Sequence, residues 1–409
     1  MAATGQIGGA PVRVATASFS LRDMTKAPFT RQVVDDPAEL GLNADAVADL
    51  IARAQREIDE GHTPSCQIAF ARNGRIALWE TLGDAAPESR YVIFSSTKPV
   101  VAGAVWILMG EGLLDVSSRV VEIVPEFASN GKDGITVEQV LLHTSGFPSA
   151  PFNPIEWDDR ERRLERFASW RCNWEPGTRF EYHPTSAHWV LAELIERCSG
   201  TDYRDFIRTR VLDPLGLSGL QVGVPIAQQG DINDLVATGA RATPDELEAV
   251  LGIRELPVTE VTTESLLSFN QPAVRAVGVP GGGGVSTAAD VALYYQALLH
   301  DPLAMWKPEV LTDVTSKVRN SFPDYMGAPA NRTRGLVVHG DDERAHLRGM
   351  GRTVSPRAFG HNGAGGQIAW GDPETGLSFC YLTNGYDQHE LRQWRRSSAI
   401  ASRAGNCLR

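Results

Sequence analysis

Lysine, cysteine and long apolar segments are scarce in this chain of 409 residues. The five cysteines are scattered without a CxxC pair, which argues against a disulfide framework or a zinc site. The longest uncharged apolar run, Pro99 to Gly110, is shorter than the roughly 20 residues that cross a bilayer. The first twenty residues lack the apolar stretch of a secretion signal. We therefore expect a cytoplasmic protein without a membrane partner.

Several catalytic and binding motifs are also missing. The sequence has no HExxH and no close cluster of histidine with carboxylates, so we expect neither a metal nor another cofactor. It has no GxSxG nucleophile elbow and no GxxxxGK[ST] phosphate loop. The glycine run from Gly281 to Gly284 is not followed by lysine, which favours a flexible or tight loop over a phosphate site. A net charge of −11 argues against nucleic acid as a partner.

Apolar spacing and turn residues predict an α/β (α+β) protein. Asn73-Gly74 predicts a hairpin, because both residues tolerate the positive φ of a two-residue turn. The segment Ser95–Leu114 is apolar on all sides, which is typical of a buried helix. Further helices are predicted over Asn43–Asp59, Val137–His143, Ser186–Cys198, Tyr203–Leu212, Pro244–Leu251, Asp290–Leu299 and Leu391–Ala404. Strands are predicted over Gln67–Ala71, Arg75–Thr81, Gly335–His339, Gly366–Trp370 and Ser378–Thr383.

The distribution of these elements predicts the domain organisation. Strands lie near both ends of the chain, whereas helices and long loops fill the middle. We expect a loose arm over 1–36, a discontinuous α/β domain over 37–114 and 285–409, and a mainly helical domain over 115–284.

Two of the five lysines follow a serine by three positions, as Ser95-Ser96-Thr97-Lys98 and Ser129-Asn130-Gly131-Lys132. The second pair lies in a polar, turn-forming stretch and is expected to be a solvated loop. The first opens the buried helix, where residues three apart share a face and free N–H groups accompany a positive helix end. Burial and the positive potential at the start of the helix both disfavour the charged ammonium form of Lys98. Lys98 is therefore a candidate base that removes the proton from the Ser95 hydroxyl.

A serine nucleophile also needs a second proton-transfer group and another oxyanion donor. Tyr182 is a candidate for the first role, because it lies in a loop just before a predicted helix, in Pro-Gly-Thr-Arg-Phe-Glu-Tyr-His-Pro. His361 is a candidate site residue, in Phe-Gly-His-Asn-Gly-Ala-Gly-Gly before an apolar strand. Taken alone, Tyr182 is better explained as a structural aromatic residue in a loop, and His361 is equally compatible with a structural role.

The ordered combination of these segments resembles the serine β-lactamase/penicillin-binding-protein superfamily. Its class C β-lactamase-like branch and the family VIII carboxylesterases are the most similar. Leu-Leu-His-Thr-Ser-Gly at 141–146 and Gly-Gly-Gly-Val-Ser-Thr-Ala-Ala-Asp at 282–290 look like further landmarks of this group. The resemblance covers roughly residues 40–385 and implies a β-lactamase-like fold, with an antiparallel sheet flanked by helices and an inserted helical domain.

The resemblance also implies roles for individual residues. Ser95 would be acylated after activation by Lys98, and Tyr182 would pass a proton to the leaving group and help to activate water. His361 would take the place of the lysine or histidine that opens a KTG-like strand. The backbone N–H groups of Ser95 and Ala364, which follows Gly363, would form the oxyanion hole.

Two departures from the family pattern concern the substrate. Pro184 stands where the third residue of Tyr-x-Asn provides a side-chain amide, and His361 replaces the KTG lysine that pairs with a β-lactam carboxylate. Both changes favour uncharged esters over β-lactams. Phe152 and Trp157 follow the 141–146 landmark and are candidates for the wall of an acyl pocket, although core packing is the alternative for each.

The sequence therefore predicts a serine carboxylesterase that acts on a small-molecule ester through an acyl-enzyme. An acyltransferase or amidase on the same fold, or a β-lactamase, remains an alternative. A catalytically silent ligand-binding protein that kept the fold is the alternative outside enzymes. The natural ester and the oligomeric state are not indicated.

Overall fold

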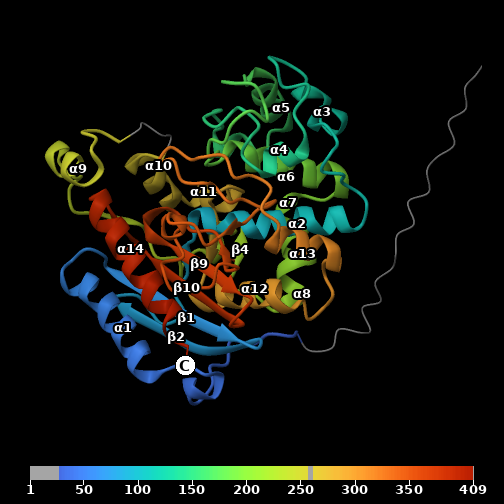
Figure 1. Cartoon of the computed structure of the whole chain (residues 1–409). Coiled ribbons are helices and arrows are strands. Elements are labelled where there is room, and N and C mark those ends of the chain that lie inside the picture. The colour runs from blue at the N-terminus through green and yellow to red at the C-terminus, as the bar shows by residue number, and fades with distance from the viewer. Residues whose placement is uncertain (1–26, 257–260, 409) are drawn as a thin grey trace, which may run out of the picture.

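The computed structural model describes residues 27–256 and 261–408. Its main sheet has six antiparallel strands in the order β2-β1-β10-β9-β8-β7 (Figure 1). The first two strands come from the N-terminal part of the chain and the other four from the C-terminal part. They are β1 (Ser65–Arg72), β2 (Arg75–Gly83), β7 (Val337–Val338), β8 (Phe359–Gly360), β9 (Ile368–Asp372) and β10 (Leu377–Thr383). The predicted antiparallel sheet is confirmed.

The hairpin between β1 and β2 forms at the predicted dipeptide, where Asn73 and Gly74 have φ values of 52° and 72°. Two smaller sheets accompany the main one. The first has the order β3-β6-β4 and the second pairs β11 with β5. Their strands are β3 (Tyr91–Val92), β4 (Gln221–Val222), β5 (Val236–Thr238), β6 (Gly284–Ser286) and β11 (Gly385–Asp387).

Helices cover both faces of the main sheet (Figure 1). On one face α1 (Ala44–Asp59) packs beside α14 (Glu390–Gly405), and on the other α12 (Ala288–His300) lies against β1, β9 and β10. The helix α2 (Lys98–Gly110) is buried and packs against α6 (Ser186–Ser199). The sheet strands are apolar on both faces, as this double covering requires.

The remaining helices are short and lie between α2 and the C-terminal strands. They are α3 (Val120–Ile123), α4 (Val137–Leu141), α5 (Arg160–Ser169), α7 (Tyr203–Ile207), α8 (Asp213–Leu215), α9 (Pro244–Leu251), α10 (Thr263–Leu267), α11 (Pro272–Val277) and α13 (Pro308–Ser316). A π-helical stretch, Arg208–Leu212, links α7 to α8. The predicted domain boundaries stay a prediction.

The predicted N-terminal arm needs a correction. Residues 1–26 lie outside the described residues, but the last ten residues of the arm are not loose. Phe29 is buried, Val33 bridges to Ile76, and Arg31 forms an ion pair with Asp290 of α12. Apolar burial and a buried carboxylate therefore hold this segment on the fold.

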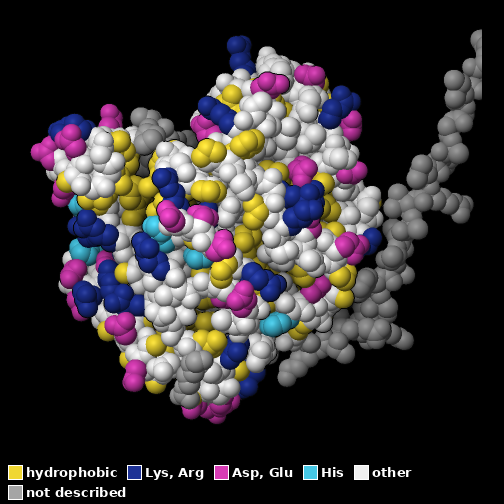
Figure 2. Space-filling view, viewed as in Figure 1, with side chains coloured by type: hydrophobic (Ala, Val, Ile, Leu, Met, Phe, Trp, Pro, Cys, Tyr) yellow, Lys and Arg dark blue, Asp and Glu magenta, His cyan; other side chains and the backbone are white. Residues whose placement is uncertain are grey.

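The surface on the face shown in Figure 2 carries basic and acidic side chains interspersed with one another. Within residues 27–256 and 261–408, no helix combines the length and apolar character needed to cross a membrane.

Candidate active site

Ser95 lies in a tight 3-10 turn, Phe94–Thr97, that leads directly into α2. The turn begins with Phe94 at φ 44°, a left-handed conformation that is costly for a bulky residue. The preceding strand β3 is fixed by its pairing with β6, and the N–H of Ile93 donates to the carbonyl of Gly284 at 2.9 Å. The nucleophile candidate is therefore held on a short, strained turn between a strand and a helix.

Lys98 is buried at the start of α2, and its Nζ lies 3.1 Å from Ser95 Oγ. The same nitrogen donates to the carbonyl oxygens of Pro184 and Gly281, each at 2.6 Å. The amine thus contacts two carbonyls and one hydroxyl. A neutral amine that donates both of its hydrogens to the carbonyls would direct its lone pair at the hydroxyl of Ser95.

Tyr182 approaches Ser95 from a different segment, and its hydroxyl donates to Ser95 Oγ at 2.8 Å. Its ring lies 4.9 Å from Lys98 Nζ and 4.9 Å from the ring of His143. The structure therefore brings Ser95, Lys98 and Tyr182 together, with the hydroxyl of Ser95 between the two other groups.

The 141–146 landmark supports the segment that carries Tyr182. His143 Nδ1 accepts from the N–H of His183 at 3.1 Å, and the His143 carbonyl accepts from Glu181 N–H. His183 Nε2 lies 3.1 Å from Ser145 Oγ. Burial lowers the pKa of His143 well below its ordinary value, and lowers that of His183 to about 3. Both rings are neutral and act here as hydrogen-bonding and packing groups.

The glycine run is a site of close backbone approach. A Cβ on Gly281 would lie 2.7 Å from the Pro184 carbonyl oxygen, and one on Gly284 would lie 2.6 Å from Thr97 Oγ1. Glycine is needed here because the loop passes between the start of α2 and residue 184. The loop is therefore tight, and it supplies the Gly281 carbonyl to Lys98, a contact that sequence reasoning missed.

His361 follows β8 at the edge of the site, and its ring lies 5.9 Å from that of Tyr182. Its carbonyl accepts from Ser96 Oγ at 2.9 Å, which ties this segment to the turn of Ser95. A Cβ on Gly363 would lie 2.4 Å from the Ile93 carbonyl, so glycine permits the contact. Ala364 begins the next 3-10 turn. Its role in an oxyanion hole stays a prediction.

His361 is not the cation that a KTG-like lysine would provide. Its Nδ1 lies 2.8 Å from the Asn362 carbonyl and its Nε2 lies 3.1 Å from Arg332 Nη1. Burial, followed by the charges of Arg332 and Lys98, holds the pKa of His361 well below its ordinary value. Arg332 was not among the predicted residues, and no motif in its segment marks it.

The structure places the two aromatic candidates in the helical part of the core. Trp157 is fully buried, stacks on Trp189 at 5.0 Å and has its ring under the Arg163 guanidinium. This packing favours the alternative of a core residue for Trp157, and its place in a pocket stays a prediction. Phe152 stacks on Trp189 at 4.5 Å and is only partly buried, so its role stays a prediction.

The second Ser-Lys pair also differs from the prediction. Lys132 is fully buried, not solvated, and its Nζ contacts Ser129 Oγ at 3.0 Å and the Trp170 carbonyl at 2.6 Å. Burial lowers the pKa of Lys132 to about 8. However, Ser129 Oγ donates its own hydrogen to the Ala168 carbonyl at 2.6 Å. A Ser-Lys contact therefore does not by itself identify the nucleophile.

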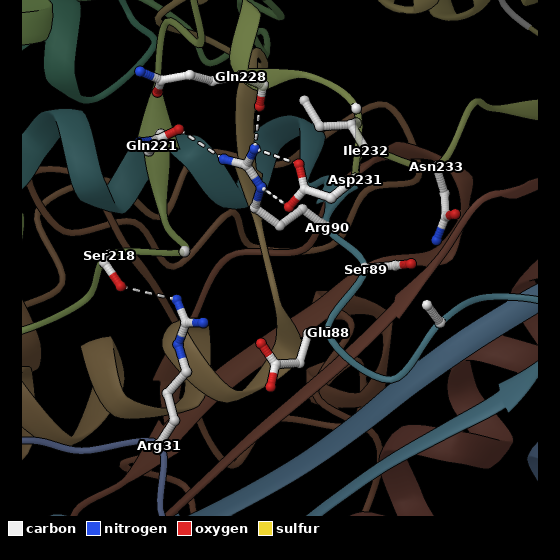
Figure 3. A pocket seen from close by; sticks show the side chains of 13 residues that line it. Arg31, Glu88, Ser89, Arg90, Ser218, Gln221, Gln228, Asp231, Ile232 and Asn233 are labelled. Carbon is white, nitrogen blue, oxygen red and sulfur yellow. Dashed lines mark hydrogen bonds and ion pairs between the residues drawn. The ribbon is translucent and has the colours of Figure 1, made fainter.

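A polar hollow of about 670 Å³ lies elsewhere on the molecule (Figure 3). Arg90 spans it with two hydrogen bonds to the Asp231 carboxylate, at 2.7 and 2.6 Å, and one to the Gln221 side chain. Neither Ser95 nor Tyr182 lines it. Its central guanidinium is already fully engaged by the protein.

Comparison with known proteins agrees with the fold. A profile of the Beta-lactamase family matches residues 47–401. The esterase/beta-lactamase LipL of Mycobacterium tuberculosis is 29% identical over 320 residues, which cover 74% of this chain and 70% of LipL. A penicillin-binding protein homolog from Caulobacter crescentus has a TM-score of 0.71 at 25% identity, covering 90% of this chain and 99% of its own. A family VIII carboxylesterase has a TM-score of 0.70 at 23% identity, covering 89% and 98%. Since the profile spans most of the chain, this protein belongs to the Beta-lactamase family of serine hydrolases.

Proposed function

We propose that this protein hydrolyses short-chain carboxylic esters through an acyl-enzyme on Ser95. The observation that carries the proposal is the position of Ser95 Oγ, 3.1 Å from Lys98 Nζ and 2.8 Å from the Tyr182 hydroxyl. One neighbour can accept the proton of the nucleophile while the other can deliver a proton to the leaving group. This is the arrangement that nucleophilic catalysis with proton transfer requires.

Acylation begins with Lys98 as the neutral base. Ser95 Oγ attacks the carbonyl carbon of the ester and its proton passes to Lys98. The carbonyl oxygen becomes an oxyanion, stabilised by the N–H groups of Ser95 and Ala364. When the carbon–oxygen bond breaks, the alkoxide takes the hydroxyl proton of Tyr182, and the proton on Lys98 replaces it. The products of this step are the free alcohol and the acyl-serine.

Deacylation repeats the same steps with water. A water molecule loses one proton to the Lys98–Tyr182 pair and attacks the acyl carbon. The second tetrahedral intermediate then expels Ser95 Oγ, which regains that proton, and the carboxylic acid leaves. The base and acid roles of the pair are reversed between the two half-reactions, as microscopic reversibility requires.

The side chains at positions 184 and 361 support an uncharged substrate. Pro184 has no side-chain amide, and its carbonyl is occupied by Lys98. His361 is neutral, with both ring nitrogens engaged. Two anchors for the amide and carboxylate of a β-lactam are thus absent from these positions, and apolar contacts discriminate only gradually with chain length. The name of LipL includes both esterase and beta-lactamase, and that of the family VIII carboxylesterase gives an esterase alone, so both names are compatible with ester hydrolysis.

The test is kcat/KM for p-nitrophenyl acetate, butyrate and octanoate beside that for nitrocefin, on one preparation. We expect the short esters to be hydrolysed, with a gradual decline for the longer chain, and nitrocefin to be a poor substrate. A value for nitrocefin equal to or above that for the esters would make the protein a β-lactamase.

Covalent labelling identifies the nucleophile. A fluorophosphonate should add once to the wild-type protein and to Ser129→Ala, but not to Ser95→Ala, as read from the intact mass. Ser129 is the matched control, because its hydroxyl also contacts a buried lysine. A wild-type protein that is folded but neither labelled nor active would be a silent binding protein.

A further inference from the structure

Arg332 places a guanidinium at the edge of the candidate active site, without a carboxylate in direct contact among the described residues. Its Nη1 lies 3.1 Å from His361 Nε2, and its Cζ lies 5.0 Å from the centre of the Tyr182 ring and 5.3 Å from that of Phe180. In the part of the chain that the structure describes, no carboxylate lies within ion-pair distance of Arg332, although the charge of Asp324 acts on it from further away, and its buried Nε has no hydrogen-bond partner. The positive charge therefore faces aromatic rings and a histidine.

The contact with Arg332 determines the protonation of His361. A guanidinium nitrogen can only donate, so Nε2 of His361 must accept and carries no hydrogen. The hydrogen then resides on Nδ1 and is donated to the Asn362 carbonyl at 2.8 Å. With both nitrogens committed, His361 is neither a general acid nor a cation. The fixed charge at this edge of the site belongs to Arg332.

The Lys98 amine, the Arg332 guanidinium and two neutral histidines surround Tyr182. Lys98 and Arg332 lie near its ring at 4.9 and 5.0 Å, and the rings of His143 and His361 lie at 4.9 and 5.9 Å. The pKa of each histidine is held well below its ordinary value, first of all by burial. Burial lowers the pKa of Arg332 from its ordinary high value, but a guanidinium is still charged near neutral pH, so Arg332 is the charged neighbour of the Lys98–Tyr182 pair.

Backbone pairing holds Arg332 in this place. Its N–H and carbonyl exchange hydrogen bonds with Asn320, at 2.9 and 3.1 Å. Asn320 is itself tied to the carbonyl of Leu142 through its side chain at 3.0 Å, next to His143. On the other side, β7 pairs with β8 through Val337 and Gly360, directly before His361. The backbone around Arg332 is thus held on one side by Asn320 and on the other by the β7–β8 pairing, which fixes where the guanidinium starts.

We propose that Arg332 is a positioning residue for ester hydrolysis. It fixes His361 as the neutral Nδ1–H tautomer, and its charge favours the singly deprotonated, active state of the Lys98–Tyr182 pair. This role rests on the proposed function, in which that pair must begin the reaction with one proton fewer. A nearby positive charge disfavours an additional proton on the pair, so removing the charge makes the active state form only at higher pH.

The experiment measures kcat/KM for p-nitrophenyl butyrate against pH in the wild type, Arg332→Gln and Arg332→Lys. The guanidinium lies 5.0 Å from the centre of the Tyr182 ring, so in Arg332→Gln the loss of its charge should move the midpoint of the acidic side of the pH profile (the acid limb) upward by about one to two pH units. Arg332→Lys keeps the charge and should restore most of that shift. The matched control is Arg334→Gln in the same segment, which loses ion pairs to Glu138 and Asp313 but should leave the limb in place.

A second variant distinguishes the effect of Arg332 on the acid limb from that of His361. His361→Gln keeps an acceptor for Arg332 and removes the imidazole, so the acid limb should keep its midpoint. If the limb instead moves or disappears in His361→Gln, the titrating group is His361 and the proposal is overturned. A limb that stays in place in Arg332→Gln also overturns it, as does a change confined to KM. A wild-type protein without esterase activity would refute the proposed function itself, an outcome distinct from these.

Discussion

His188 gives the sharpest test of how the buried side of the site is built. Its ring is buried on α6, stacks on that of His143 at 6.0 Å and has no hydrogen-bond partner for either nitrogen among the described residues. Burial, with added repulsion from Lys98 and other positive or histidine neighbours, holds its pKa well below the ordinary value. In the unfolded chain the same imidazole titrates near pH 6.5. Unfolding in mild acid must therefore take up a proton at this residue.

The sign and size of the effect follow from that difference. Where the unfolded state binds more protons than the folded state, stability falls as pH falls. For a histidine that stays neutral when folded, lowering the pH from 7.0 to 5.5 costs slightly more than about 1 kcal/mol of unfolding free energy. His143, His183 and His361 are depressed in the same direction, so together with His188 the loss reaches about 5 kcal/mol. That is a large part of the 5–15 kcal/mol typical of a protein.

The variant His188→Leu isolates the contribution of His188 to this pH dependence, because leucine fills a similar volume with an apolar group that cannot take up a proton. Urea unfolding at pH 7.0 and pH 5.5 should show that the variant loses about 1 kcal/mol less than the wild type over this interval. At pH 7.0 the variant should be at least as stable, because two unpartnered buried nitrogens are removed. Equal losses in both proteins would show that His188 is protonated or hydrated in the folded state.

Two other predictions concern the proton donor and the N-terminal segment. Tyr182→Phe removes one hydroxyl, and kcat/KM for an alkyl butyrate should fall about 10²–10⁴-fold. The value for p-nitrophenyl butyrate should fall much less, because its leaving group needs no proton. Equal losses for the two esters would exclude Tyr182 as the proton donor to the leaving group. Arg31→Met leaves the fully buried carboxylate of Asp290 without its cation, and the free energy of unfolding at pH 7 should drop by about 3 kcal/mol, the low end for a broken buried pair since Arg31 is 29% exposed. Burial already raises the pKa of Asp290, so this carboxylate becomes neutral as the pH falls toward the range in which an unfolded aspartate titrates. The loss of unfolding free energy in Arg31→Met should therefore shrink over that range. A loss independent of pH would contradict this explanation.

Elements with strong local signals were predictable from the sequence. The helix α9 has the predicted bounds, because Thr243 and Glu246 form a capping box at its start and Gly252 ends it in the left-handed conformation. The helix predicted over Asn43–Asp59 is confirmed as α1, with Asn43 as its N-cap. Where the sequence pattern was weak, the predicted bounds of an element were less accurate. The strand predicted over Gly335–His339 is only Val337–Val338, because Gly335 lies at φ 125° outside the strand conformation.

The parts of the site that depend on tertiary contacts could not be predicted in the same way. Motif order placed Ser95, Lys98 and Tyr182 in one site, and the structure has them within hydrogen-bond distance. The Gly281 carbonyl and the Arg332 guanidinium reach that site from segments whose sequences show only a glycine run and an irregular loop. Gly281 contributes a backbone carbonyl, which every residue has, and Arg332 contributes a positive charge, which is common on protein surfaces. No residue pattern therefore distinguishes either of them.

The two Ser-Lys pairs show what the sequence motif leaves undetermined. Both lysines are buried, both contact their serine hydroxyl within about 3 Å, and both donate to backbone carbonyls. The difference lies in the second partner of each serine. Ser129 gives its hydrogen to a carbonyl, which cannot pass on a proton, whereas Ser95 receives one from the Tyr182 hydroxyl and keeps its own available for Lys98. The tyrosine therefore converts a structural contact into a site able to transfer a proton in both directions.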